Sequence, residues 1–385
     1  MDKFQFPKGF LWGAATSAYQ VEGGIKNDWS EAGEKFDAGK ACDHYNRFEE
    51  DFNIVKSLGH NAHRFSIEWS RIEPEEGKWD EKEIEHYRNV IKALRNRGIE
   101  PFVTLWHWPI PLWLRNKGGA KLKKIPLYFS RYAEKIVSEF KNNVIFWITL
   151  NEPEIYATNS YLKGVWPPQK KNPISYFLII RNLIKAHREA YKMIKKIQPN
   201  ARIGIAKNNI YFEAYQNKIV NRILKKFIDW WWNFYFLNQI KNYQDFIGLN
   251  HYFHNRINYG FNKNENLKVS DMGWELYPEG IYHVLKDLKR YKKPIYITEN
   301  GLADANDEKR EKFIKGHLYW MAKAIQDGVD VRGYFYWSLL DNFEWDSGFW
   351  PRFGLVEIDY KIMERKIRKS ALEYKKIIEN RCLDD

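Results

Sequence analysis

The sequence has few cysteines and no long apolar run. Cys42 and Cys382 are its only cysteines among 385 residues, and they lie far apart in the chain. This pattern gives neither a disulfide framework nor a metal-ligand pair, so we expect a reduced, cytoplasmic setting without metal or cofactor. The chain has no run of about 18 apolar residues and no apolar N-terminal stretch with a cleavage site. We therefore predict neither a membrane span nor a secretion signal.

Acidic residues are also fewer than basic residues. The 62 Lys and Arg exceed the 49 Asp and Glu, which gives a formal charge of +13. The basic clusters, at residues 121–124, 195–196, 289–293 and 365–369, are scattered through polar segments of helical pattern. Nucleic-acid binding needs a contiguous basic patch, so solvated helix faces explain these clusters better and we expect no nucleic-acid partner.

Aromatic residues, by contrast, are abundant. The chain contains 17 Trp, 24 Tyr and 24 Phe, and 44% of its residues are hydrophobic. A chain of this composition can bury enough apolar surface to offset the entropy cost of ordering, which excludes disorder. We expect a fold with a large core.

Short β-branched or aromatic runs alternate with segments of helical periodicity along the whole chain. The eight runs lie at residues 11–16, 62–69, 101–106, 144–150, 202–206, 246–252, 295–298 and 331–337. The clearest helical segments lie at 81–97, 128–141, 175–197, 278–291 and 308–327. No linker, change of composition or internal repeat divides the chain, so the pattern predicts one α/β domain over residues 1–385, a single (β/α)8 TIM barrel.

Two glutamates follow apolar strands directly and enter a Pro or Gly turn. Glu152 lies in Ile-Thr-Leu-Asn-Glu-Pro and Glu299 in Ile-Tyr-Ile-Thr-Glu-Asn-Gly, at the predicted ends of strands four and seven. The C-terminal ends of barrel strands are where catalytic groups gather. Glycoside hydrolysis needs two such carboxyl groups, one protonated and one ionised. Rings and amides at neighbouring strand ends suit a sugar, because they offer apolar faces and planar polar groups.

Longer motifs in order along the chain resemble those of glycoside hydrolase family 1, the retaining β-glycosidases. They are Phe-Leu-Trp-Gly-Ala-Ala-Thr-Ser-Ala-Tyr-Gln-Val-Glu-Gly-Gly (10–24), Arg-Phe-Ser-Ile-Glu-Trp-Ser-Arg-Ile (64–72), Thr-Leu-Trp-His-Trp (104–108), Thr-Leu-Asn-Glu-Pro (149–153), Ile-Tyr-Ile-Thr-Glu-Asn-Gly-Leu-Ala (295–303) and Tyr-Trp-Ser-Leu-Leu-Asp-Asn-Phe-Glu-Trp (336–345). The residues of these motifs are most similar to those of archaeal-type and thermophilic members of the family. The resemblance implies hydrolysis of terminal β-D-glucosyl, galactosyl or fucosyl units of small glycosides or oligosaccharides.

The resemblance also implies a role for each matching residue. Glu299 would be the nucleophile and Glu152 the general acid and base, with Arg64 and Tyr252 holding Glu299 ionised. Asn151 would bind the sugar 2-hydroxyl. The expected sugar-binding set comprises Gln20, His107, Trp108, Asn250, Trp337, Glu344 and Trp345, with Trp274 as a platform for the leaving group, where ordinary packing is an equal alternative.

Two alternative functions follow from the same motifs. One is a 6-phospho-β-glycosidase, which the carboxylate of Glu344 opposes because it would repel a 6-phosphate. The other is a catalytically weak sugar-binding barrel, which the intact pair of glutamates opposes. A homo-oligomer is compatible with the sequence.

The chain is short for this family. Segments after Gly24, between Ile240 and Phe246, and between Phe253 and Trp274 are trimmed, so we expect a more open cleft. A dense aromatic run occupies residues 228–236, which we interpret as a helix packed on the outside of the barrel near strand six. If some of these rings are exposed, they would instead form an apolar patch.

Overall fold

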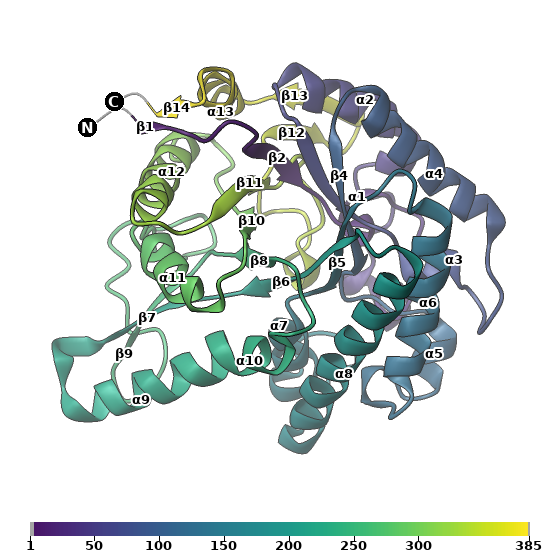
Figure 1. Ribbon diagram of the computed structural model, residues 1–385, viewed down its shortest axis with the longest axis horizontal. Helices are drawn as coiled ribbons and strands as arrows, with labels where there is room; N and C mark the ends of the chain where they lie inside the picture. Colours follow the sequence, from purple (N-terminus) through teal and green to yellow (C-terminus); the bar gives the residue numbers. More distant parts are fainter. Residues whose placement is uncertain (1–3, 384–385) are drawn as a thin grey trace.

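The computed structural model describes residues 4–383 and has a closed barrel of parallel strands at its centre (Figure 1). Around the barrel the strands follow the order β10, β11, β2, β3, β4, β5, β6 and β8. Their bounds are β2 (Leu11–Ala15), β3 (Ala62–Ser66), β4 (Glu100–Trp106), β5 (Phe146–Asn151), β6 (Arg202–Asn208), β8 (Ile247–Asn250), β10 (Ile295–Asn300) and β11 (Val331–Trp337). Each of the eight runs predicted from the sequence overlaps one of these strands, which confirms the (β/α)8 architecture.

Helices surround the barrel and connect its strands. The long ones are α2 (His44–Ser57), α4 (Glu81–Asn96), α6 (Ile125–Phe140), α8 (Pro173–Ile197), α9 (Ile219–Asp229), α11 (Gly280–Leu288), α12 (Arg310–Gln326) and α13 (Lys369–Asn380). The short ones are α1 (Ala18–Val21), α3 (Trp69–Ile72), α5 (Leu112–Asn116), α7 (Pro153–Ala157) and α10 (Phe236–Ile240). None of the helices within residues 4–383 is long and apolar enough to span a bilayer.

Three small sheets lie outside the barrel. Near the termini, β1 (Phe4–Gln5) pairs with β14 (Cys382–Leu383), so the C-terminal segment forms a strand in which Cys382 is buried, although the sequence there reads as a polar tail. The others join β12 (Val356–Asp359) to β13 (Glu364–Ile367), and β7 (Tyr211–Ala214) to β9 (His254–Ile257). The β7–β9 pair follows strands β6 and β8, and it supports α9 at the edge of the molecule (Figure 1).

The aromatic run at residues 228–236 is helical, but its rings are only partly covered. It spans the end of α9, a π-helical turn η6 (Trp230–Tyr235) and the start of α10. Phe234 and Phe236 are buried, whereas Trp230 is 45% exposed. The predicted helix is therefore confirmed, and packing against the barrel accounts for only some of its rings.

Five aromatic rings fill the interior of the barrel. Phe102 lies 4.1 Å from Phe146 and 4.8 Å from Phe335, measured between ring centroids, and Phe246 and Tyr296 complete the cluster. Gly204 on β6 makes room for this packing, because a Cβ there would lie 2.5 Å from the Phe246 ring. The interior of the barrel is thus a packed core, above which the strand ends carry polar groups.

Phe102→Ala should therefore destabilise the protein by about 3–5 kcal/mol, because a fully buried ring is replaced by a cavity that its neighbours fill incompletely. Guanidinium chloride titration followed by circular dichroism would measure the change. Phe261→Ala, at a ring that is 64% exposed, is the matched control and should change stability by less than about 0.5 kcal/mol. Equal losses for the two variants would contradict this account of the core.

Candidate active site

Polar side chains converge at the C-terminal ends of the barrel strands. Glu299 is the second-to-last residue of strand β10, and Glu152 lies between the end of β5 and the start of α7. Parallel strands in a barrel bring their C-terminal ends to one face, so residues far apart in sequence meet there. Both carboxyl groups are almost fully buried.

The Glu299 carboxylate is held by a cation and a phenol. Arg64 Nη1 donates to Oε1 at 2.5 Å, and the Tyr252 hydroxyl donates to Oε2 at 2.7 Å. Arg64 itself is completely buried. A buried ion pair with additional hydrogen bonds strongly favours the ionised carboxylate.

The remaining Arg64 donors are bound in turn. Nε donates to Thr104 Oγ1 at 3.1 Å, Nη1 also donates to the Thr298 carbonyl oxygen at 3.1 Å, and Nη2 donates to Asn151 Oδ1 at 2.7 Å. These contacts tie β3 to β4, β5 and β10, so four strands fix the position of one guanidinium group.

The Glu152 carboxyl group has amide partners in place of a cation. Asn250 Nδ2 donates to Oε1 at 2.8 Å and Asn208 Nδ2 at 3.2 Å. Burial, together with the nearby negative charge of Glu299, raises the pKa of Glu152 to about 8. Glu152 is therefore protonated at neutral pH.

The two carboxyl groups thus differ in their protonation. Burial raises the pKa of Glu299 above its ordinary value, but the Arg64 charge and the Tyr252 hydrogen bond act in the opposite direction. With one negative charge to place in the buried pair, the charge resides on Glu299 and the proton on Glu152. The site thus holds a protonated carboxyl group near an ionised one.

Asn151 links the charged groups to His107 and Trp108. Its Nδ2 donates to His107 Nε2 at 3.1 Å, and its carbonyl oxygen accepts from Trp108 Nε1 at 2.9 Å. Because Nε2 accepts, the proton of the neutral imidazole lies on Nδ1. Burial lowers the pKa of His107 well below its ordinary range. His107 Nδ1 is buried and finds no hydrogen-bond partner among the described residues, so it can donate to a ligand.

Aromatic rings form the wall beside His107. Its imidazole is stacked 5.9 Å from the rings of both Trp337 and Trp345, and Trp108 packs 4.5 Å from Trp345, measured between centroids. All three tryptophans are buried. His107 joins this wall to Asn151, which in turn contacts Arg64.

Gln20 and Glu344 lie together at this wall. Gln20 Nε2 donates to Asn342 Oδ1 at 2.9 Å and lies 3.4 Å from Glu344 Oε2. Burial and the nearby carboxyl groups of Glu299 and Glu152 raise the pKa of Glu344 to about 8. The structure therefore brings Gln20 and Glu344 together with each other and close enough to the carboxyl pair to interact electrostatically.

Three residues of the site adopt backbone conformations that side chains rarely take. Trp108 has φ +86°, Glu152 has φ +42° and Trp345 has φ +52°. Such conformations cost about 1–3 kcal/mol each and persist only where the surroundings enforce them. The surrounding fold therefore holds these three residues in conformations that lower its stability but fix the direction of their side chains.

The residues beside Tyr252 are less enclosed than the wall beside His107. Trp274 is half-buried and packs 4.7 Å from Phe253, 5.8 Å from Phe353 and 5.9 Å from Tyr252. Tyr252 and Phe253 are also half-buried. Trp274 thus lies beside the Glu299 partner Tyr252, on the more accessible side.

The structure also adds residues that we did not select from the sequence. Asn208 donates a hydrogen bond to Glu152. Separately, Thr298 Oγ1 donates to Asn250 Oδ1 at 2.7 Å. The sequence could have indicated Asn208, because it ends β6 just as Asn151 ends β5. The predicted apolar run, however, stops at Ala206. Two other strand-end acids, Glu22 and Glu68, lie elsewhere: Glu22 pairs with Arg71 at 2.9 Å and Glu68 accepts from Ser70.

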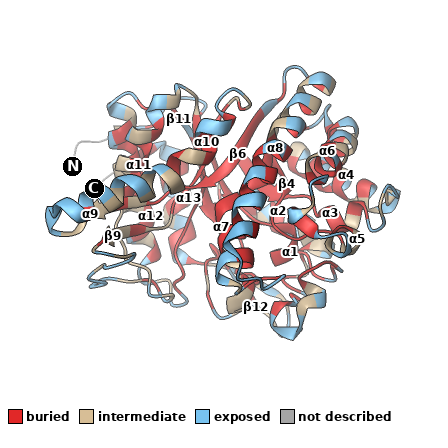
Figure 2. Cartoon of the chain, turned by 90° about the horizontal axis from the view of Figure 1, so that it is seen from below, coloured by how far each residue is buried: buried red, intermediate tan, exposed pale blue. Residues whose placement is uncertain are grey.

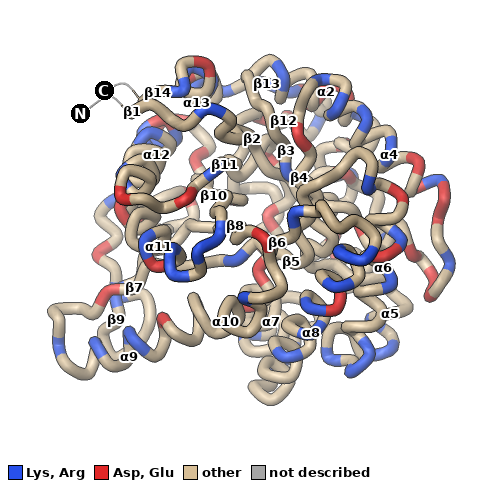
Figure 3. Tube along the Cα trace, in the orientation of Figure 1, with Lys and Arg blue, Asp and Glu red and all other residues tan. Residues whose placement is uncertain are grey.

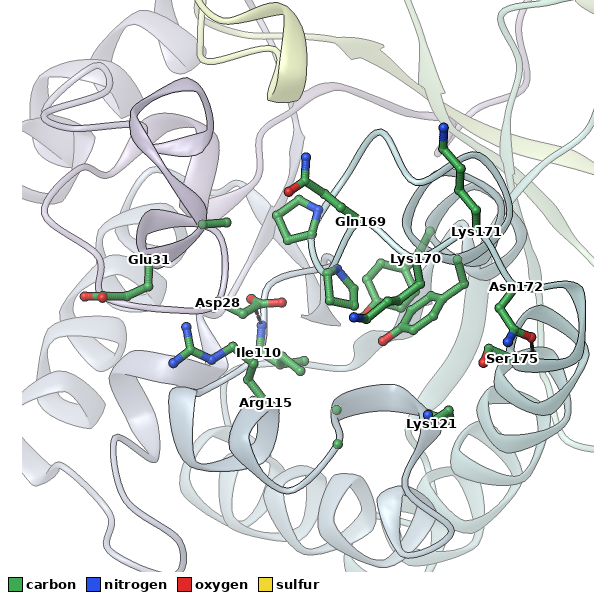
Figure 4. Close-up of a pocket in the computed structure, with 17 residues that line it drawn as sticks. Asp28, Glu31, Ile110, Arg115, Lys121, Gln169, Lys170, Lys171, Asn172 and Ser175 are labelled. Carbon is green, nitrogen blue, oxygen red and sulfur yellow. Dashed lines mark hydrogen bonds between the residues drawn. The ribbon is translucent and has the colours of Figure 1, made fainter.

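A separate cavity of about 610 Å³ lies between the loop that contains Asp28, the segment of α5, and the start of α8 (Figure 4). The side chains of Asp28, Arg115 and Lys170 are among those that surround it. Neither Glu152 nor Glu299 lines this cavity. It is thus distinct from the site at the strand ends.

Comparison with known proteins identifies relatives of the whole chain. The model of the family described as glycosyl hydrolase family 1 matches residues 2–238 and 218–382. β-Glucosidase A of Thermotoga maritima is 37% identical, with 100% of both chains covered. That alignment runs over 448 positions, more than the 385 residues of this chain, so the relative has residues in segments that are shorter here.

Solved structures agree with this relationship. The Thermotoga maritima β-glucosidase in complex with glucoimidazole superposes with a TM-score of 0.94 at 35% identity and covers 99% of this chain and 100% of its own. A β-glycosidase from Pyrococcus horikoshii gives a TM-score of 0.93 at 40% identity, with 99% and 96% covered. The resemblance drawn from the motifs is confirmed.

The proton on Glu152 can be observed directly. In protein labelled with ¹³C at the glutamate carboxyl carbons, Glu152 should titrate with a pKa of about 8. In the Glu299→Gln variant this pKa should fall, because the neighbouring charge is removed. The spectrum of Glu152→Gln identifies the signal. The buried carboxyl of Glu68, whose pKa burial raises to about 7, is the control and should keep its titration; an unchanged Glu152 titration in Glu299→Gln would refute the coupling.

Proposed function

The chain belongs to glycosyl hydrolase family 1, and we propose that Glu299 and Glu152 are the nucleophile and the acid/base of its hydrolysis reaction. The protein is a retaining β-glycosidase of the β-glucosidase type. Its substrates are small β-glycosides with a terminal glucosyl, galactosyl or fucosyl unit. The observation that carries the proposal is the asymmetry of the pair: Glu299 is bound to the Arg64 guanidinium group, whereas Glu152 accepts from the amides of Asn250 and Asn208.

In the first half-reaction the Glu299 carboxylate attacks the anomeric carbon. The bond from this carbon to the glycosidic oxygen breaks, and the proton of Glu152 moves to that oxygen, so that the leaving group departs as an alcohol. The products are a glycosyl ester of Glu299 and an ionised Glu152. Arg64 and Tyr252 favour this step because they keep Glu299 ionised until it reacts.

The second half-reaction reverses these roles. Once Glu299 is an ester, its charge no longer raises the pKa of Glu152, so the Glu152 carboxylate can act as a base. It removes a proton from water while the water oxygen attacks the anomeric carbon, and Glu299 leaves as a carboxylate. One water molecule is consumed, and both glutamates return to their starting states.

The sugar itself is held by the enclosed wall of the site. Trp337 provides an apolar floor for the ring, and His107 Nδ1 donates to a sugar hydroxyl. Gln20, Glu344, Trp108 and Trp345 contact further hydroxyls, and Asn250 orients Glu152. Asn151 lies between Arg64 and His107 and binds the 2-hydroxyl. Trp274, on the accessible side, contacts the leaving group.

Neither alternative function is favoured. A catalytically weak sugar-binding barrel would not need the complete set of contacts around Arg64, and the relatives that cover the chain fully are named β-glucosidases and glucohydrolases. The same names give no support to a 6-phosphosugar substrate. We further propose that the enzyme acts in the cytoplasm, since two cysteines that lie as far apart in the chain as Cys42 and Cys382 give no disulfide framework.

Substrates with different leaving groups separate the roles of the two glutamates. Glu152→Gln should lower kcat/KM for an alkyl β-glucoside by about 10²–10⁴-fold, because a poor leaving group needs the proton. For dinitrophenyl β-glucoside, whose leaving group needs no proton, the loss in the same parameter should stay within about tenfold. Glu299→Gln should lose at least about 10⁴-fold on both substrates.

The matched control is Glu68→Gln, another buried glutamate of the same barrel, which should retain activity on both substrates. A Glu152→Gln enzyme that loses both substrates equally would exclude Glu152 as the acid.

The pH dependence follows from the protonation of Glu152. A raised pKa means that the acid is present below pH 8 and is lost above it, so kcat/KM should fall as the pH rises through about 8. This alkaline limb should disappear in Glu152→Gln assayed on dinitrophenyl β-glucoside. Glu344→Gln should keep it, although the pKa of Glu344 is also raised to about 8. If the alkaline limb disappears in Glu344→Gln and persists in Glu152→Gln, Glu344 and not Glu152 is the acid.

A further inference from the structure

Helix α9 has an exposed apolar face. Ile219, Ile223, Phe227 and Trp230 recur at helical spacing, and Val220 extends the face at its start. Ile223 is 64% exposed and Phe227 62%. In a helix that only packs on a barrel, such positions are polar because they face water.

The face continues onto the N-terminal turns of α8 through a chain of rings. Phe227 lies 6.1 Å from Trp230, Trp230 lies 6.1 Å from Trp231, and Trp231 lies 5.3 Å from Phe177, measured between centroids. Ile174 and Phe177 on α8 are exposed as well. We call this surface the α9 face: Ile174, Phe177, Ile219, Val220, Ile223, Phe227 and Trp230. Single exposed apolar residues need no explanation, but a contiguous group of this kind marks an interaction site.

Cations border the α9 face. Lys218, Arg222 and Lys226 are exposed and form no ion pair with any acid among the described residues. Lys225 is the exception, because it pairs with Asp229 at 2.9 Å. Figure 3 shows several basic positions along α9, and the whole chain carries a charge of +13. An occupant of this surface must therefore be apolar where the rings are and negative around them.

The inner face of α9 is packed, so the helix is already folded and firmly supported. Leu224, Ile228 and Trp232 pack against a small cluster formed by Ile210, Phe212 and Ile257. Asn221 Nδ2 donates to the Tyr215 carbonyl oxygen at 3.0 Å, and Asn221 Oδ1 accepts from Tyr259 N at 3.1 Å. The outer face is thus not needed to complete the core of this region.

We propose that the α9 face docks on an anionic lipid bilayer surface. A helix with aromatic and aliphatic side chains on one side and Lys and Arg along its borders lies in the plane of the headgroups. The ring of Trp230 suits the boundary between acyl chains and water. Arg222 and Lys226 gain electrostatic energy from negative headgroups.

Charge argues against a second copy of the chain as the occupant. A symmetric dimer through the α9 face would bring Arg222 and Lys226 of one molecule towards the same residues of the other. Like charges at the border of an apolar contact oppose association, whereas an anionic surface is complementary to them. The position of α9 at the edge of the molecule allows a flat surface to approach it (Figures 1 and 2).

Vesicle flotation tests the proposal with the full-length protein. Wild type should float with vesicles of phosphatidylglycerol and phosphatidylcholine at low salt, and should float at least about tenfold less with phosphatidylcholine alone. The triple variant Ile223→Ser/Phe227→Ser/Trp230→Ser should lose at least about tenfold in bound fraction, because the apolar contact area is removed. Arg222→Gln/Lys226→Gln should weaken binding to the anionic vesicles alone.

The matched control is Leu127→Ser/Ile362→Ser/Trp350→Ser, which removes three equally exposed apolar side chains from other parts of the surface. It should float like wild type. Turnover of nitrophenyl β-glucoside and the circular dichroism spectrum should be the same in all variants, since none of these residues belongs to the site.

Three results would overturn the proposal. They are wild type that does not float, flotation that the triple variant retains, and a wild-type dimer in sedimentation velocity that the triple variant dissociates. The last result would assign the α9 face to a second copy. Because flotation does not depend on catalysis, its outcome is independent of the roles assigned to Glu152 and Glu299.

Discussion

The buried ion pair between Arg64 and Glu299 is the constraint on which the catalytic end of the barrel depends. Moving two charges out of water costs several kcal/mol per ion, and the attraction between them offsets this cost only if the remaining donors are also bound. The contacts of Arg64 to Thr104, Thr298 and Asn151 meet that requirement. They also fix four strands relative to one another, so the same contacts that compensate the buried charge set the geometry of the reaction.

The ion pair also determines what Glu152 can do. Two buried carboxyl groups near one another cannot both be ionised at modest cost, and the guanidinium group of Arg64 is bound to Glu299. Glu152 is left with neutral donors from Asn250 and Asn208, which tolerate a proton on the opposite oxygen. The division of labour between two chemically identical side chains thus follows from where one arginine lies on β3.

Regular features of the fold could be predicted from the sequence because each has a local cause. The eight strands appeared as apolar runs, and Glu152 and Glu299 were visible because polar residues at strand ends interrupt them. Asn208 also ends a strand, but the sequence analysis missed it, since the charged Lys207 precedes it and made the run look finished at Ala206. Lys207 lies 3.3 Å from Glu154, a pairing between β6 and α7 that only the folded structure brings together. The tautomer of His107 likewise depends on Asn151, a distant residue in the chain.

The α9 segment shows a different limit of sequence reasoning. Its apolar residues lie on both sides of the helix, and a pattern of that kind does not tell which side the fold covers. The structure does: Leu224, Ile228 and Trp232 face inward, beside Phe253, which in turn packs on Trp274 at the accessible side of the site. The inner side chains thus support the side of the site on which Trp274 lies, while the outer rings of Phe227 and Trp230 contact other rings of the same surface segment. Since exposed apolar side chains add little to folding stability, the outer face is explained by binding and not by packing.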